Sequence, residues 1–224
     1  MAFSLIDSKI AEGTNGATTA AMDTTASGGA KVITLVVSYK TSIGAPAMSD
    51  SQSNTYSARV SEDGPFDITQ ALYDTFSPST NASHTFTITN ASAFCNIMAM
   101  AWNETGTPTF DQSSHADADQ PGSLTPANNN SLIVTGGLRT FTDVYTVPTN
   151  FTLLFSDADT ASVDFGGGSG YEIQTTATAR NPQWTDDGSG FGAWTTLQAI
   201  YAPGGGGGTV VQDIIGSGII AAPR

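Results

Sequence analysis

The chain carries little charge, and most of that charge is negative. Only 12% of its 224 residues are Asp, Glu, Lys or Arg, and 20 acidic residues against 7 basic ones give a formal net charge of −13. Nucleic acids and anionic lipid surfaces are bound largely through clustered Lys and Arg, which neutralise phosphate groups. The composition therefore excludes nucleic acid as the main partner and argues against a membrane surface.

Cysteine and histidine are also scarce, and these side chains are often used for metal binding and nucleophilic catalysis. Cys95 is the only cysteine, so no internal disulfide forms, and the apolar stretch after it predicts a buried, unreactive thiol. The two histidines, His84 and His115, leave little material for a zinc site or a catalytic triad. We expect His84 to be solvated or to cap a strand.

Long hydrophobic runs are missing. No segment reaches the ~18 consecutive apolar residues of a membrane span. Near the start, Asp7, Lys9 and Glu12 stand where a signal peptide needs an uninterrupted apolar core. We therefore expect the protein to be made in a cytoplasm and to stay soluble there.

The polar residues that are abundant, Thr, Ser, Asn and Gly, favour strands and turns over helices. Segment 84–90, HTFTITN, alternates strictly and places Phe86 and Ile88 on one face, which is typical of a strand with one solvated face. Segment 95–102, CNIMAMAW, would also suit a short buried helix, but its neighbours favour a strand. We expect a hairpin over 47–60 and further strands at 3–10, 32–39, 131–138, 150–156, 171–179 and 193–202.

These strands predict an all-β protein with one antiparallel β-sandwich or jelly-roll-like domain, residues 1–203, followed by an extended C-terminal arm, residues 204–224. The arm begins with a tether of five glycines, Gly204 to Gly208. We expect the apolar strip after the tether to bury its side chains in a groove on a neighbouring protein, because a tether separates a domain from what its tail binds. The predicted partner-binding residues are Val210, Val211, Ile214, Ile215, Ile219 and Ile220.

Two acidic segments are candidate cation sites. In the first, 110–122, Asp111, Asp117 and Asp119 lie with His115 in what we expect to be one loop, and alternate carboxylates are ligands for Ca²⁺. The segment lacks the central glycine and terminal glutamate of an EF-hand, so a solvated loop is the competing interpretation. The second segment, 156–170, has the same two interpretations.

Segment 165–171, FGGGSGY, is expected to be a turn. A strand rather than a helix is predicted after it, so it lacks the helix N-terminus that binds phosphate.

Trp102, Trp184 and Trp194 allow two interpretations. Exposed tryptophans form stacking platforms for sugars, whereas tryptophans more often pack in a core or against a loop. The sugar interpretation would use Trp184 and the adjacent loop 186–194 as its contact surface.

From the closing stretch 181–203, a resemblance to known proteins can be recognised, and it covers most of residues 30–203. The chain resembles β-sandwich proteins found among the structural genes of tailed bacteriophages and among bacterial surface proteins. The likeness is carried by SDSQSNTYS, with Asp50 and Asn54 ahead of Tyr56, and by the segments Gly122–Gly136 and Gly192–Ala202. It implies a virion or surface module without an assigned activity, and the glycine tether and isoleucine strip lie outside the shared pattern.

Together these observations predict a non-enzymatic bacteriophage virion protein, most simply a decoration or accessory protein on the capsid. Its expected partners are the major capsid protein or neighbouring subunits, it is expected to form homo-oligomers, and it needs no cofactor. The first alternative is a tail-fibre or adhesin module that binds host glycans. The second is a glycan-processing enzyme, which would need two carboxylates facing each other across a cleft.

Overall fold

The computed structural model describes residues 2–13, 16–64, 67–90, 95–140, 144–157, 165–186 and 191–205. In these residues the regular elements are antiparallel strands and two short 3₁₀ turns, η1 (Ala26–Gly28) and η2 (Thr41–Ile43). The prediction of an all-β protein of the sandwich type is therefore confirmed. The predicted arm beyond Gly205, with its six apolar side chains at 210–220, lies outside the described residues.

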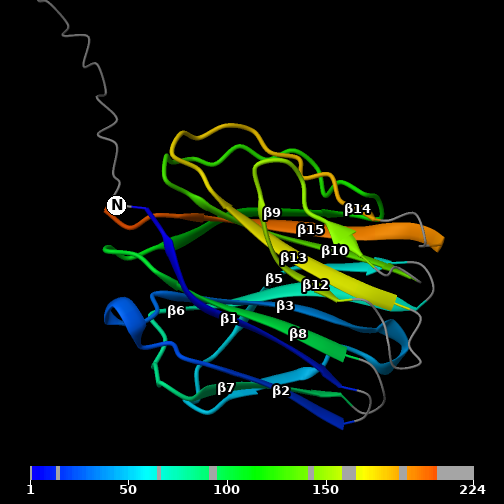
Figure 1. Ribbon diagram of the computed structural model, residues 1–224, viewed down its shortest axis with the longest axis horizontal. Coiled ribbons are helices and arrows are strands. Elements are labelled where there is room, and N and C mark those ends of the chain that lie inside the picture. Colours follow the sequence, from blue (N-terminus) through cyan, green and yellow to red (C-terminus); the bar gives the residue numbers. More distant parts are fainter. Residues whose placement is uncertain are drawn as a thin grey trace, which may run out of the picture.

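Three sheets are stacked in layers, with the central sheet between the other two (Figure 1). The central sheet has five strands, in the spatial order β1 (Ser4–Gly13), β8 (Cys95–Asn103), β3 (Val32–Lys40), β6 (Ile68–Phe76) and β5 (Ser57–Gly64).

The second large sheet also has five strands, in the order β12 (Thr152–Asp157), β13 (Phe165–Ile173), β10 (Leu132–Thr140), β15 (Phe191–Ala202) and β9 (Thr109–Ala116).

Two smaller sheets complete the fold. A three-stranded sheet covers the opposite face of the central sheet, in the order β2 (Gly16–Met22), β7 (His84–Asn90) and β4 (Ala47–Asp50). A short ladder pairs β11 (Tyr145–Thr146) with β14 (Thr185–Asp186).

The central sheet is apolar on both faces because both faces are covered. On one face, Ile33, Leu35 and Val37 of β3 pack with Phe86 and Ile88 of β7. A strand buried on both faces reads as a continuous apolar run instead of an alternating one. This explains why VITLVVSY of β3 is apolar except for the buried Thr34 and Ser38, whereas β7 alternates because its outer face is solvated.

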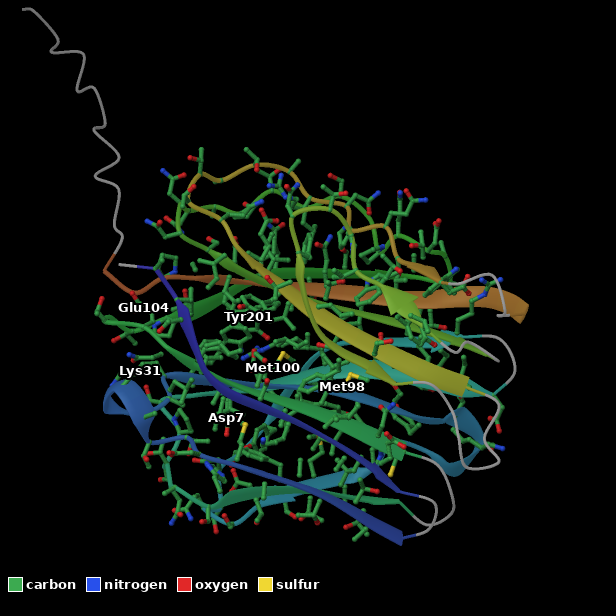
Figure 2. The ribbon with its side chains drawn as sticks, in the orientation of Figure 1. Asp7, Lys31, Met98, Met100, Glu104 and Tyr201 are labelled. Carbon is green, nitrogen blue, oxygen red and sulfur yellow. The ribbon has the colours of Figure 1, made fainter. Side chains whose placement is uncertain are left out.

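The other face of the central sheet packs against the second sheet. Val32 and Val36 of β3 join Met98 and Met100 of β8 and Tyr201 of β15 in one buried cluster. Figure 2 shows the two methionines and Tyr201 between the two large sheets. Fully burying a side chain of this size contributes about 1.5–3 kcal/mol, so this double interface is the main stabilising feature of the fold.

Glycines in the second sheet allow its neighbours to approach closely. Gly137 of β10 and Gly168 of β13 are paired, and a Cβ atom at these positions would lie 2.6 and 2.7 Å from ring atoms of Trp184. On the inner face, a Cβ at Gly136 would lie 2.6 Å from Oε1 of Gln70 in the central sheet. At Gly137 and Gly168 the neighbour is a rigid indole ring, so these two positions require glycine, whereas a side chain at Gly136 would have to displace the end of Gln70.

Several expectations about secondary structure are wrong, and three of them concern the sheets described above. The run FGGGSGY belongs to strand β13, not to a turn, because its glycines serve packing on both faces of the sheet. The strand predicted at 171–179 is also misplaced. The observed strand, β13, begins at Phe165 and ends at Ile173. The segment 47–60 is not a hairpin: β4 pairs with β7 and β5 pairs with β6, so the turn between them carries the chain from one sheet to another.

The contact between Gly137 and Trp184 can be tested by a double-mutant cycle. Gly137→Ala should lower the free energy of unfolding by about 1–3 kcal/mol, because the added methyl group overpacks the site under the indole ring. In a Trp184→Leu background the same change should cost less than about 0.5 kcal/mol. Urea unfolding of the four proteins measures both values. If Gly137→Ala lowered the free energy of unfolding equally in both backgrounds, the contact with Trp184 would not be the reason for the glycine.

Candidate functional site

Asp50, the last residue of β4, is the centre of a buried polar cluster. Its Oδ1 accepts hydrogen bonds from the backbone N–H groups of Gln52 at 2.9 Å and Asn54 at 3.0 Å. Its Oδ2 accepts from Nδ2 of Asn54 and from the hydroxyl of Tyr56, both at 2.7 Å. Nε2 of His84 lies 3.0 Å from the same oxygen. The motif SDSQSNTYS thus has a structural role, since its carboxylate shapes the turn after β4 and joins it to β7.

The expectation that His84 is solvated is wrong, because the imidazole is fully buried, and the residue is the first of strand β7. Its Nδ1 lies 3.1 Å from Oγ1 of Thr24, and its ring stacks on Phe86 with centroids 4.3 Å apart. The succession Asp50, His84, Thr24 has the form of a catalytic relay. All three side chains are buried, however, and the threonine hydroxyl also bonds the backbone of Asn81. The cluster therefore serves stability, because a substrate has no access to it.

The environment of the cluster shifts the pKa values of Asp50 and Tyr56. Burial raises the pKa of Asp50, but the hydrogen bonds donated by Tyr56 and Asn54 outweigh this effect and bring the pKa below its ordinary value. Burial and the nearby carboxylate raise the pKa of the Tyr56 phenol, so Tyr56 remains a donor.

The candidate Ca²⁺ ligands do not share a loop. Asp111 and His115 lie on strand β9, whereas Asp117 and Asp119 follow that strand. Asp119 accepts a hydrogen bond from Nε2 of Gln183 at 3.0 Å. Among the described residues, no group of three or more His, Cys, Asp or Glu side chains is placed to hold a metal. The second acidic segment lies partly outside these residues, at 158–164.

The tryptophans pack in the interior. Trp102 and Trp184 are fully buried, and Trp194 is half-buried with its ring 5.7 Å from that of Tyr145. The interpretation of Trp184 as a sugar-stacking surface is therefore wrong, and the alternative of a packing role is confirmed for it. Residues 187–190 of the adjacent loop lie outside the described residues.

Other ionisable groups with limited exposure are used in internal contacts. Cys95 is buried as expected, its sulfur lies 3.2 Å from Oγ1 of Thr18, and burial raises the pKa of its thiol. Arginine–carboxylate pairs join strands and loops at Arg59–Asp74, Arg139–Asp186 and Arg180–Glu172.

The start of the glycine tether is fixed to the domain by a buried carboxylate. Glu104 is 2% exposed and accepts hydrogen bonds from the backbone N–H groups of Gly106 and of Gly204, the latter at 3.3 Å. A Cβ atom at Gly204 would lie 1.8 Å from the backbone nitrogen of Thr107, so the crossing of these two segments requires glycine. Gly204 is therefore a packing residue of the domain as well as the first residue of the predicted tether.

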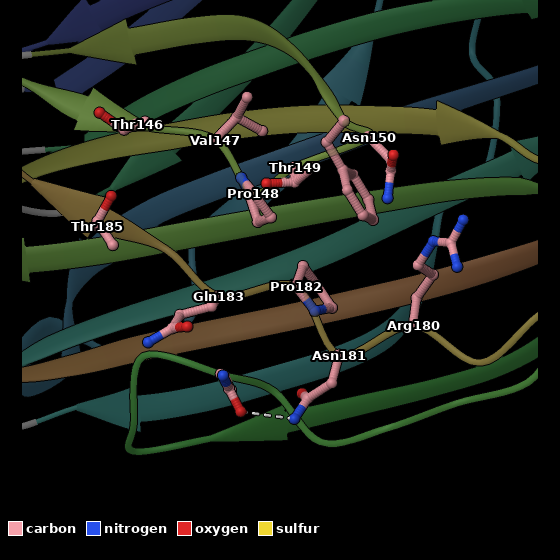
Figure 3. A pocket seen from close by; sticks show the side chains of 12 residues that line it. Thr146, Val147, Pro148, Thr149, Asn150, Arg180, Asn181, Pro182, Gln183 and Thr185 are labelled. Atoms are coloured by element: carbon pink, nitrogen blue, oxygen red, sulfur yellow. Dashed lines mark hydrogen bonds between the residues drawn. The ribbon is translucent and has the colours of Figure 1, made fainter.

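A cleft of about 460 Å³ lies on the outer side of the second sheet, between segments 146–151 and 180–185 (Figure 3). One wall carries Thr149 and Asn150, and the other carries Asn181 and Gln183. Apart from the arginine at its edge, its lining is made of uncharged side chains. The sequence analysis leaves 146–149 and 180–185 outside the expected strands and expects a strand from residue 150, and it gives no sign that two segments so far apart in the chain face each other.

Comparison of the chain with protein-family models, with curated proteins and with solved structures found no significant match. Among the described residues, no helix is long and apolar enough to cross a membrane.

Removing the charge of Asp50 should destabilise the fold in a pH-dependent way. Asp50→Asn should lower the free energy of unfolding by about 3 kcal/mol at neutral pH, because the amide cannot accept from all the donors that surround it. The folded-state pKa is lowered, so this stability is present above the unfolded-chain pKa of about 3.9 and is lost as the pH falls through the folded value.

The measurement is urea unfolding of both proteins between neutral and acidic pH. The difference between them should shrink on acidification. A difference that stays constant over this range would show that the Asp50 charge does not stabilise the cluster.

Proposed function

We propose that this chain is a non-enzymatic structural protein of a bacteriophage virion, a decoration or accessory protein that attaches to neighbouring subunits through its C-terminal arm. The observation that carries the proposal is the contact between the buried carboxylate of Glu104 and the backbone of Gly204. It holds Gly204, the first residue of the predicted tether, against the domain. A fixed exit point allows an arm to bind a neighbour with a defined geometry, and several arms acting together add avidity.

The uses of the ionisable side chains also support a structural role. The carboxylate of Asp50 and the imidazole of His84 are buried against each other, and Arg59 is paired with the buried Asp74. Groups held in this way stabilise the layers of the fold. The resemblance to phage and surface β-sandwich proteins is consistent with such a scaffold, and fold alone does not assign a chemistry.

The attachment can be tested on particles of the phage whose genome encodes the chain. The chain should copurify with intact virions through a density gradient. Virions assembled without the gene should rebind the full-length protein but not the protein truncated after residue 205. The four-fold variant Ile214→Ser, Ile215→Ser, Ile219→Ser, Ile220→Ser should behave like the truncated protein, because it removes the apolar grip. Absence from purified virions, or equal rebinding by the truncated protein, would contradict the proposal.

The role of the exit point is tested by comparing two truncations. Ending the chain after residue 205 keeps the donor at Gly204 and should leave the free energy of unfolding within about 0.5 kcal/mol of the full-length value. Ending it after residue 203 removes that donor from a buried carboxylate and should cost about 1–3 kcal/mol. Urea unfolding measures both. Equal stability of the two truncated proteins would show that the contact at Glu104 does not hold the exit.

A further inference from the structure

We propose that the cleft between residues 146–151 and 180–185 binds a neutral saccharide. This site is distinct from the predicted C-terminal arm, and the proposal does not depend on the virion assignment. It also differs from the sugar surface considered around Trp184, whose ring lies beneath this region in the interior.

The size and rigidity of the cleft suit a small ligand. Its volume of about 460 Å³ falls within the range of about 300–1,000 Å³ that small-molecule sites occupy. One end is closed by the β11–β14 ladder, in which Thr146 pairs with Thr185. One wall is tightened by the hydrogen bond from Phe151 N–H to the carbonyl of Pro148, at 3.0 Å. The site is therefore largely formed before a ligand arrives, which reduces the entropy lost on binding.

The opposite wall is fixed by contacts with the loop after β9. The side-chain amide of Asn181 donates to Oε1 of Gln120 at 2.7 Å and accepts from the backbone N–H of Gly122 at 2.9 Å. The backbone of Arg180 pairs with that of Leu124 in an antiparallel bridge. These contacts hold the wall in place without using the side-chain carbonyl oxygen of Gln183.

The charge of the cleft is internally compensated, which selects against ionic ligands. The guanidinium of Arg180 donates from Nε and Nη2 to the two carboxylate oxygens of Glu172, each at 2.6 Å. Its Nη1 donates to the hydroxyl of Thr178 at 2.8 Å and to the carbonyl of Ala179 at 3.2 Å. Four of the five N–H donors of Arg180 are thus used within the protein and its charge is paired with Glu172, so a phosphate or carboxylate ligand would have to compete with that carboxylate.

Uncharged polar groups remain available to a ligand. Thr149 and Asn150 are exposed, and within the described part of the chain their side chains make no hydrogen bond. Asn150 has a φ of 77°, in the left-handed region that few residues other than Gly, Asn and Asp tolerate, so a tight turn holds it at the rim. On the facing wall, Nε2 of Gln183 donates a hydrogen bond to Asp119, and the side-chain carbonyl oxygen of Gln183 remains available as an acceptor.

The apolar part of the lining complements these groups. Val147 and Pro148 are half-buried, and Phe151 and Pro182 are buried below the rim. A sugar ring presents hydroxyl groups at its edge and C–H groups on its faces, so it can use amide donors and acceptors at the rim together with aliphatic contacts at the floor. Since the described lining offers no exposed aromatic ring for stacking, we expect weak binding, with a dissociation constant of about 1 mM.

The experiment is an NMR titration of the full-length ¹⁵N-labelled protein with maltotriose, cellotriose and chitobiose, each up to about 20 mM, well above the expected dissociation constant. At least one of the three should shift the backbone amide signals of 146–151 and 180–185 along a saturable curve. The anionic sugar sialyllactose should bind no more tightly than lactose, because the cleft has no free cation.

The specific variant is Asn150→Gly, which removes the amide and keeps a residue that adopts positive φ without strain. It should raise the dissociation constant about fivefold, as expected for the loss of one neutral hydrogen bond. The matched control is Asn130→Gly, which changes another asparagine with positive φ, 60°, away from the cleft and should leave binding unchanged.

Three results would overturn the proposal. One is the absence of saturable shifts at these residues with all three neutral saccharides. Another is equal binding by the Asn150→Gly and wild-type proteins. The third is a shift of the same signals by a synthetic peptide of residues 206–224 and not by any saccharide, which would assign the cleft to a contact between protein chains.

Discussion

Burial of the central sheet on both faces is the constraint on which the rest of the structure depends. A sheet that is covered on one side needs one apolar face, whereas the central sheet is covered on both sides and needs two. In its strands β3 and β8, every residue except the last is therefore buried. The inner faces of the three-stranded sheet and of the second sheet have to fit the side chains on the two faces of the central sheet. The glycines of β10 and β13 follow from that requirement and from the indole packed on the outer side.

This arrangement leaves few places for function. Asp50, His84, Asp74 and Cys95 lie inside, where they bond one another or nearby hydroxyls and cations. Among the described parts of the chain that can meet a partner are the loops over the outer side of the second sheet and the end of β15. The first of these carries the cleft, in which Arg180 is paired with Glu172, and the second carries the contact between Glu104 and Gly204.

Local sequence patterns predicted local structure well. The alternation in 84–90 indicated β7 and its buried face, and the run 32–39 indicated a buried strand, although it could not show what covers each side. Residues that depend on distant partners were misread. The sequence predicts a turn at 165–171, whereas these residues belong to β13, and one reason for their glycines is the close approach of Trp184 to Gly168, which comes from a later segment of the chain.

The candidate site could be predicted from the sequence less well than the fold. The burial of His84 depends on Thr24 and Asp50, which come from separate parts of the chain, and no short pattern joins them. The cleft depends on two loops about thirty residues apart that face each other only after β13 and β15 pair with β10. The acidic run after 110 suggested clustered ligands, but β9 extends through its first half and separates the side chains.

Native-state hydrogen exchange tests most directly whether the doubly covered central sheet holds the fold together. Amides that exchange only by global unfolding identify the most stable unit of a protein. The backbone amides of 32–40 and 95–103 should be in this class, with an exchange free energy equal to that of global unfolding by urea. The result that would contradict the account is exchange of these amides through a lower-energy opening while those of β10, β13 and β15 stay protected.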